Sequence, residues 1–288
     1  MRRTGLLLAA AAALVASCRK DRGAPPPAGA ERVLALDGAA GRLKVSDGGS
    51  GEPAVVFVHG LGGDLEAWRA QLDHLRPSRR AVAYDQRGHG GSEPARDGAY
   101  TIEALADDLE AVRRGLGLGR MVLVGHSLAG TVLTAYARAH PERVAGLVYV
   151  DAVGDFAAIP PEHLRPLIDR EASPSFDRAA QRAAFEELLG PRARPRTRER
   201  VLASLGALDP KAFAALRRSM FGFSARGDPP APGAPALAVE ADGPVLPIMA
   251  CAVLRLPRVA LPDVSHWLQL DDPEGLDRAL DAFLASAR

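Results

Sequence analysis

The residue whose surroundings most clearly indicate a chemical role is Ser127, which lies between a short apolar run and a helical pattern. In Gly125-His126-Ser127-Leu128-Ala129 the residues two before and two after the serine are small. A tight turn from a strand into a helix needs small residues there, and it presents the serine hydroxyl above the sheet. A serine hydroxyl is a weak nucleophile at neutral pH and needs a base to accept its proton. The pattern therefore predicts covalent catalysis by Ser127, assisted by a histidine from elsewhere in the chain.

The elements that must position this serine alternate between short apolar runs and helical stretches. This alternation is typical of an α/β fold, and we expect a mostly parallel central sheet of about eight strands flanked by helices. The expected strands are 33–36, 43–45, 54–58, 81–85, 121–124, 144–150, 236–239 and 254–260. The helices expected around the sheet are 65–75, one that begins at the N-cap Thr101, 128–139 and 273–287.

The segment 153–234 differs from the rest because it contains no convincing strand. It holds helical patterns separated by proline, around 161–171, 176–189, 198–207 and 210–221. We therefore expect a helical cap inserted into the sheet domain. Four of its residues have the spacing of internal packing and could also line an apolar pocket: Phe213, Met220, Phe221 and Phe223.

Four motifs follow one another in the order of a known family. They are His59-Gly60-Leu61-Gly62-Gly63, Asp85-Gln86-Arg87-Gly88-His89-Gly90-Gly91-Ser92, Gly125-His126-Ser127 and Val264-Ser265-His266-Trp267. Together they resemble the α/β-hydrolase fold-1 enzymes, which include esterases, lipases and lactonases. The resemblance covers residues 32–288 apart from the variable cap, and it implies one α/β-hydrolase domain over that range.

The resemblance implies a catalytic base and an oxyanion hole. His266 follows the last expected strand and precedes the closing helix, which is the place of the base in this family. Two backbone N–H groups would stabilise the negative charge on the substrate oxygen, one from Leu128 after the nucleophile and one from Leu61. The other histidines in the motifs are expected to be structural: His59, His89 and, pointing away from the site, His126.

The acid that orients the base has three candidates. Relatives carry it after the strand expected at 236–239, which makes Asp242 the first choice. Glu240 takes that place if the strand ends one residue earlier. Asp151, at the end of the run 144–150, occupies an alternative acid position that some members of the family use.

The amino terminus has the features of an export signal. Arg2 and Arg3 precede an apolar stretch from Leu6 to Ala16, which is too short for a membrane span but suits a signal peptide. It ends in Val15-Ala16-Ser17-Cys18, which resembles the lipobox of bacterial lipoproteins. We expect a signal peptide over 1–17 and a lipidated Cys18 followed by a proline-rich tether to residue 31. The alternative is an ordinary secretory signal and a soluble periplasmic or secreted protein.

Composition narrows the possible partners. The 288 residues are 47% hydrophobic and 25% charged, with a formal net charge of +1. This balance provides no strong field for nucleic acid. Nothing in the sequence indicates a metal or another cofactor, because no cluster has metal-ligand spacing and the glycine-rich stretches lack phosphate-loop spacing.

Taken together, the residues predict a serine hydrolase that acts on a small or medium apolar ester through an acyl-enzyme. Its partners would be this small-molecule substrate and, through the lipid on Cys18, a membrane surface. Lactonases, carbon–carbon bond hydrolases and cofactor-free haloperoxidases share the same apparatus and are alternatives. Epoxide hydrolases and dehalogenases of this fold carry an aspartate where Ser127 stands. An alternative of another class is a surface lipoprotein that binds a ligand without catalysis.

Overall fold

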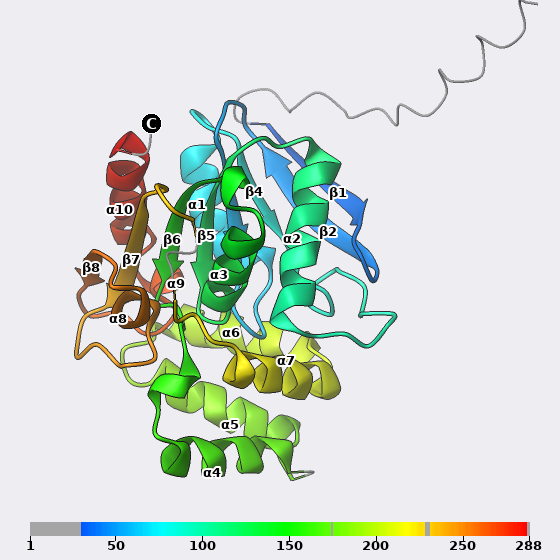
Figure 1. Cartoon of the computed structure of the whole chain (residues 1–288), viewed down its shortest axis with the longest axis vertical. Helices are drawn as coiled ribbons and strands as arrows, with labels where there is room; N and C mark the ends of the chain where they lie inside the picture. The colour runs from blue at the N-terminus through cyan, green and yellow to red at the C-terminus, as the bar shows by residue number, and fades with distance from the viewer. Residues whose placement is uncertain (1–29, 174, 228–230, 287–288) are drawn as a thin grey trace, which may run out of the picture.

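A single eight-stranded sheet forms the centre of the molecule (Figure 1). The structure is a computed structural model that describes residues 30–173, 175–227 and 231–286. The strand order is β1-β2-β4-β3-β5-β6-β7-β8, and every neighbouring pair from β4 to β8 is parallel. The strands are β1 (Glu31–Asp37), β2 (Arg42–Gly48), β3 (Ala54–Val58), β4 (Ala81–Tyr84), β5 (Met121–His126), β6 (Val144–Val150), β7 (Ala236–Ala241) and β8 (Arg258–Leu261). The expected sheet is confirmed.

Helices cover both faces of the sheet and its carboxyl edge. The longer ones are α1 (Arg69–Leu75), α2 (Ile102–Leu116), α3 (Ala129–Ala139), α4 (Pro161–Ala172), α5 (Arg178–Leu189), α6 (Pro195–Ala207), α7 (Pro210–Gly222) and α10 (Pro273–Ser286). The short ones are η1 (Leu65–Trp68), η2 (Pro141–Arg143), η3 (Phe156–Ala158), α8 (Ala250–Leu254) and α9 (Leu268–Asp271).

The central strands are buried on both sides, as parallel strands between two helical layers must be. In β3 all five residues are buried, and successive side chains point to opposite faces. Val55 and Phe57 pack against α1 and α10, whereas Val56 and Val58 belong to the core under α2, α3 and the cap. The continuous apolar run 54–58 therefore contributes side chains to the hydrophobic cores on both faces of the sheet.

Helix α2 begins at the residue expected to cap it. The Oγ1 atom of Thr101 accepts the N–H of Ala104 at 3.1 Å, and Gly117 ends the helix in the left-handed conformation. The residues of its apolar stripe are all buried: Ile102, Leu105, Leu109 and Val112.

The cap consists of α4 to α7, which lie together between β6 and β7 in the chain and beyond the carboxyl ends of the central strands (Figure 1). Each of these four helices begins with a proline or follows an aspartate that caps it, which explains the sharp breaks between them. The expected helical cap region is confirmed. The expected acyl-pocket candidates Phe213, Met220 and Phe221 are buried within it, where Phe221 packs edge-on against Phe156 at 4.8 Å.

One expected element is wrong in its first half. Residues 254–260 were expected to form one strand, but helix α8 ends at Leu254 and β8 begins only at Arg258. Arg255, in the left-handed conformation, ends α8 and redirects the chain. A short apolar run does not by itself distinguish a strand from a helix, and this ambiguity explains the difference.

The expected signal peptide, Cys18 and nearly all of the tether lie outside the described residues. Among the residues that the structure does describe, no helix is long and apolar enough to cross a bilayer.

Candidate active site

Ser127 lies in a strained turn between β5 and α3. Its φ angle is +55°, a left-handed conformation that costs a non-glycine residue about 1–3 kcal/mol. Three backbone hydrogen bonds hold it there: its N–H donates to the carbonyl of Val150, and its carbonyl accepts the N–H groups of Gly130 and Val153. The turn is thus held by β6 and the segment after it as well as by its own helix.

The turn leaves no room for larger side chains. A Cβ atom added to Gly125 would lie 3.1 Å from the Cβ of Ala129 and 2.8 Å from a methyl group of Leu133. A Cβ on Gly130 would lie only 2.6 Å from the carbonyl oxygen of Val153. The small residues of the motif are therefore a steric requirement of this turn.

His266 reaches Ser127 from the far end of the sheet. It lies between β8 and α9, and its Nε2 atom is 2.9 Å from the Ser127 hydroxyl oxygen. The imidazole is 18% exposed, so its environment is largely protein. This distance lets the imidazole accept the hydroxyl proton directly.

The carboxylate beside His266 belongs to Asp151. Its Oδ2 atom lies 2.5 Å from Nδ1 of His266. Asp151 directly follows β6, where its φ angle of +41° turns the side chain toward the site. Its N–H donates to the carbonyl of Val239 at 2.8 Å, and its Oδ1 accepts the N–H of Ala241 at 3.1 Å. Both carboxylate oxygens are thus oriented by hydrogen bonds.

The first choice for the acid, Asp242, is wrong on this geometry. Its carboxylate forms an exposed ion pair with Arg192 at 2.5 Å. Strand β7 continues to Ala241, beyond the expected end at residue 239, and the next residue, Asp242, contacts Arg192 and not His266. In addition, β6 is the direct neighbour of β5 in the sheet, whereas β7 is one strand farther from Ser127.

Glu240 does not contact His266 either. It is buried near the end of β7, and its Oε2 accepts a hydrogen bond from Nε of Arg258 at 2.8 Å. The sequence signal for Asp151 is its position directly after the apolar run 144–150, and this run forms the strand that pairs with β5.

The position of His126 differs from the expected one. Its Nε2–H donates to the backbone carbonyl of His266 at 2.8 Å, and the two rings lie 4.7 Å apart. Burial and the nearby His266 ring hold the pKa of His126 well below its usual value, so it is neutral at physiological pH. The residue before the nucleophile therefore contacts the backbone of the base, a role that sequence reasoning missed.

The expected oxyanion donors lie close to Ser127. A Cβ atom on Gly60 would be 3.0 Å from the Cβ of Ser127, which places the 59–63 loop directly against the nucleophile. Leu61 and Leu128 are both buried. Within the described part of the chain, neither of their N–H groups donates a hydrogen bond. Two free donors beside a nucleophile are what an oxyanion hole requires.

Apolar side chains of the cap pack directly against the 59–63 loop. A Cβ atom on Gly62 would lie 3.0 Å from Leu205 of α6 and 3.3 Å from the ring of Phe185 of α5. Phe185 in turn lies 5.7 Å from Trp267, the residue after the base. These three side chains form an apolar wall close to the site, and Phe185 and Leu205 were not among the expected pocket residues.

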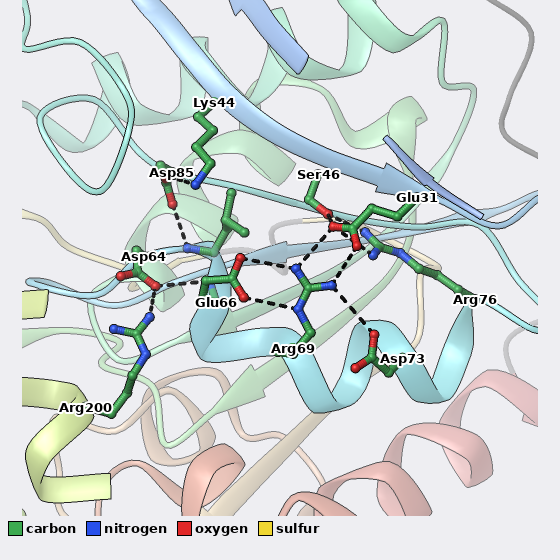
Figure 2. Close-up of polar contacts among 11 residues, drawn as sticks. Glu31, Lys44, Ser46, Asp64, Glu66, Arg69, Asp73, Arg76, Asp85 and Arg200 are labelled. Carbon is green, nitrogen blue, oxygen red and sulfur yellow. Dashed lines mark hydrogen bonds and ion pairs between the residues drawn. The ribbon is translucent and has the colours of Figure 1, made fainter. Parts of the chain in front are cut away.

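Polar contacts connect the residues directly after this loop to the cap and to the core (Figure 2). Asp64 caps η1 by accepting the N–H of Glu66 at 3.0 Å, and it also pairs with Arg200 of α6. Beside it, the buried carboxylate of Asp85 accepts the N–H groups of Leu65 and Gly91, both at 2.7 Å. Hydrogen bonds and an ion pair therefore hold the chain just after the loop, and apolar cap residues cover the loop itself.

Comparison with known proteins agrees with this fold. The thermophilic esterase from Thermogutta terrifontis superimposes with a TM-score of 0.70 at 26% identity, over 89% of this chain and 99% of that one. Epoxide hydrolase 3 of Xenopus tropicalis is 39% identical over 109 residues, 38% of this chain and 30% of that protein. Human protein ABHD8 is 35% identical over 121 residues, 41% of this chain and 28% of that protein. The aligned part of the chain thus spans less than a third of the length of these two curated relatives.

The family profile described as alpha/beta hydrolase fold matches residues 53–235, which include Ser127, Asp151 and the whole cap. Since this match covers more than half of the chain, the protein belongs to the alpha/beta hydrolase fold family.

Proposed function

We propose that the protein is a serine esterase that hydrolyses small or medium apolar carboxylic esters through an acyl-enzyme. The observation that carries the proposal is the continuous hydrogen-bonded series from Ser127 to His266 to Asp151, with distances of 2.9 Å and 2.5 Å. A hydroxyl, an imidazole and a carboxylate in this order are the parts of acyl transfer.

In the first half of the reaction, Ser127 Oγ attacks the ester carbonyl carbon while its proton moves to His266 Nε2. The carbonyl oxygen becomes negatively charged and accepts hydrogen bonds from the N–H groups of Leu61 and Leu128. Collapse of this intermediate breaks the bond to the alcohol, which leaves with the proton from His266. Asp151 keeps Nδ1 of His266 protonated and stabilises the charged imidazole.

In the second half, water attacks the acyl group on Ser127. His266 accepts a proton from this water and returns it to the serine oxygen as the carboxylic acid departs. The enzyme is then restored with no net change of charge. No step requires a group other than the side chains and N–H groups named above.

The serine also favours esters over epoxides, although a relative is named an epoxide hydrolase. An aspartate that opens an epoxide forms an ester, which water can cleave at its carbonyl carbon. A serine would form an ether with the same substrate, and an ether has no carbonyl carbon for water to attack. Ser127 therefore supports chemistry at an acyl carbon.

The test is hydrolysis of p-nitrophenyl acetate and butyrate by the purified protein, together with labelling by a fluorophosphonate. The wild type should hydrolyse both esters and take up the label, and Ser127→Ala should do neither. A wild type that neither hydrolyses nor labels would contradict the proposal and favour a protein that only binds its ligand. A panel of acyl lengths and lactones then defines the preferred substrate.

We also propose that the protein is exported and attached to a membrane through a lipid on Cys18, with cleavage before this residue. The support is the sequence Val15-Ala16-Ser17-Cys18 after a short apolar core. Metabolic labelling with a fatty acid should mark the wild type and not Cys18→Ser. Equal labelling of the two would exclude lipidation of Cys18.

A further inference from the structure

The two peptide groups on either side of Leu61 are both held in direction by hydrogen bonds. The carbonyl of Gly60 accepts Nδ1–H of His59 at 2.8 Å and the N–H of Gly63 at 3.1 Å. Since the C=O and N–H of a planar trans peptide point in opposite directions, this also sets the direction of the Leu61 N–H. On the other side, the N–H of Gly62 donates to Nε2 of His89 at 3.2 Å.

Both histidines must be neutral with the proton on Nδ1. His59 Nε2 accepts the N–H of Gln86 at 3.0 Å, which leaves Nδ1 to donate to Gly60. His89 Nε2 accepts from Gly62, and its Nδ1 donates to the carbonyl of Arg87 at 3.1 Å. Burial lowers the pKa of both, that of His89 to about 3, so both rings are neutral at neutral pH.

The loop itself could adopt other conformations without these bonds. Three of its five residues are glycine, and Gly62 has a φ angle of +70° that glycine adopts freely. A buried N–H without an acceptor is costly, so a Gly62 that lost His89 would rotate its peptide to find another partner. Rotation of that peptide changes the ψ angle of Leu61, and the neighbouring peptide, which carries the Leu61 N–H, must then shift with it.

We propose that His89 is a positioning residue, which keeps the Leu61 N–H directed at the substrate oxygen by accepting the N–H of Gly62. This inference rests on the proposed ester hydrolysis, because it concerns charge that develops on a carbonyl oxygen. It gives the motif 85–92 a function in the reaction, although none of its side chains belongs to the triad.

The test compares two variants that differ in one methylene group. The amide of His89→Gln reaches about as far as Nε2 and retains an acceptor for Gly62, whereas that of His89→Asn reaches only about as far as Nδ1. Each is assayed with p-nitrophenyl acetate and with its thiono analogue, in which sulfur replaces the carbonyl oxygen. Sulfur accepts hydrogen bonds poorly, so the ratio of kcat/KM for the two esters reports on the oxyanion donors.

We expect His89→Asn to lose about 10- to 100-fold in kcat/KM for the oxygen ester and much less for the thiono ester, because removal of a whole donor costs about 100- to 1,000-fold. His89→Gln should remain within about threefold of wild type in both rates. The inference would be overturned if the ratio of kcat/KM for the two esters were the same in His89→Asn as in wild type, whether both rates stay the same or both fall equally.

Two further controls keep these outcomes separate. If thermal unfolding shows that His89→Asn does not fold, His89→Met takes its place in the comparison with His89→Gln. Methionine has the length of glutamine but no strong hydrogen-bond acceptor. If the wild type neither hydrolyses the esters nor takes up a fluorophosphonate, the proposed function fails and the inference fails with it. An active wild type with an unchanged ratio in the variants overturns only the inference.

Discussion

The imidazole of His126 donates a hydrogen bond of 2.8 Å to the backbone carbonyl of His266, so the residue before the nucleophile holds the chain segment that carries the base. The two residues are 140 positions apart in the sequence, and His126 ends β5 whereas His266 follows β8. This bond connects the strained turn at Ser127 directly to the loop between β8 and α9. The distance between nucleophile and base is therefore set partly by a side chain that is not in the triad.

Replacing His126 should impair catalysis without abolishing it. We expect His126→Phe, which keeps a ring but removes the donor, to lower kcat about 10- to 100-fold, because small displacements of a catalytic group are costly. His126→Gln keeps an N–H donor and should lose less. Steady-state kinetics with p-nitrophenyl butyrate measures both, and equal activity of His126→Phe and wild type would exclude a positioning effect.

The identity of the acid is tested by a matched pair of aspartates. Asp151→Asn should lower kcat by about 10⁴-fold, because the amide favours the wrong tautomer of His266. Asp242→Asn, which removes only an exposed ion pair with Arg192, should stay within about twofold of wild type. The measurement is kcat for the same ester in both variants. A large loss in Asp242→Asn with little loss in Asp151→Asn would reverse the assignment.

The packing of the turn predicts opposite effects of the same substitution at two helical glycines. Gly130→Ala should destabilise the protein by about 1–3 kcal/mol, because the new Cβ would lie 2.6 Å from the Val153 carbonyl oxygen. Gly206→Ala introduces the same atom into open space in α6 and should be neutral or stabilising by up to about 1 kcal/mol. Urea unfolding of both variants measures the difference. Similar destabilisation by the two substitutions would contradict the steric explanation.

The buried His89 predicts how stability depends on pH. Its pKa is about 3 in the folded protein and 6.5 for an unperturbed histidine. Between these values the unfolded chain binds a proton that the folded protein does not, so stability falls as pH falls below 6.5 and this contribution is constant above it. Each such histidine changes the free energy of unfolding by up to about 1.4 kcal/mol per pH unit.

His89→Gln should therefore show a weaker loss of stability between pH 6.5 and 4.5 than the wild type. Urea unfolding at several pH values measures this difference, and His163→Gln, at an exposed position in α4, serves as the control. Parallel curves for the wild type and His89→Gln would mean that His89 is not held neutral in the folded protein.

Short-range patterns in the sequence were sufficient for most of the fold. The run 54–58 and the run 144–150 form strands with the expected bounds, since apolar residues between turn signals have few alternatives. The capping threonine at the start of α2 bonds to a residue within one helical turn, so the start of this helix can be predicted from the sequence. The segment 254–260 is the exception, because a short run of seven mostly apolar and basic residues suits a helix as well as a strand.

The candidate nucleophile and base could be identified from the sequence, because each belongs to a local motif whose residue types the turn or strand end demands. The acid could not be identified in this way. Each of its three candidates is a carboxylate at or after the end of an apolar run, so the sequence does not distinguish them: Asp151, Glu240 and Asp242. Only the tertiary structure distinguishes them: Asp151 follows β6, which lies beside β5, and contacts His266, whereas Asp242 pairs with Arg192. The contacts of His89 and His126 were hidden for the same physical reason, since hydrogen bonds between distant segments depend on how strands are ordered and how loops pack.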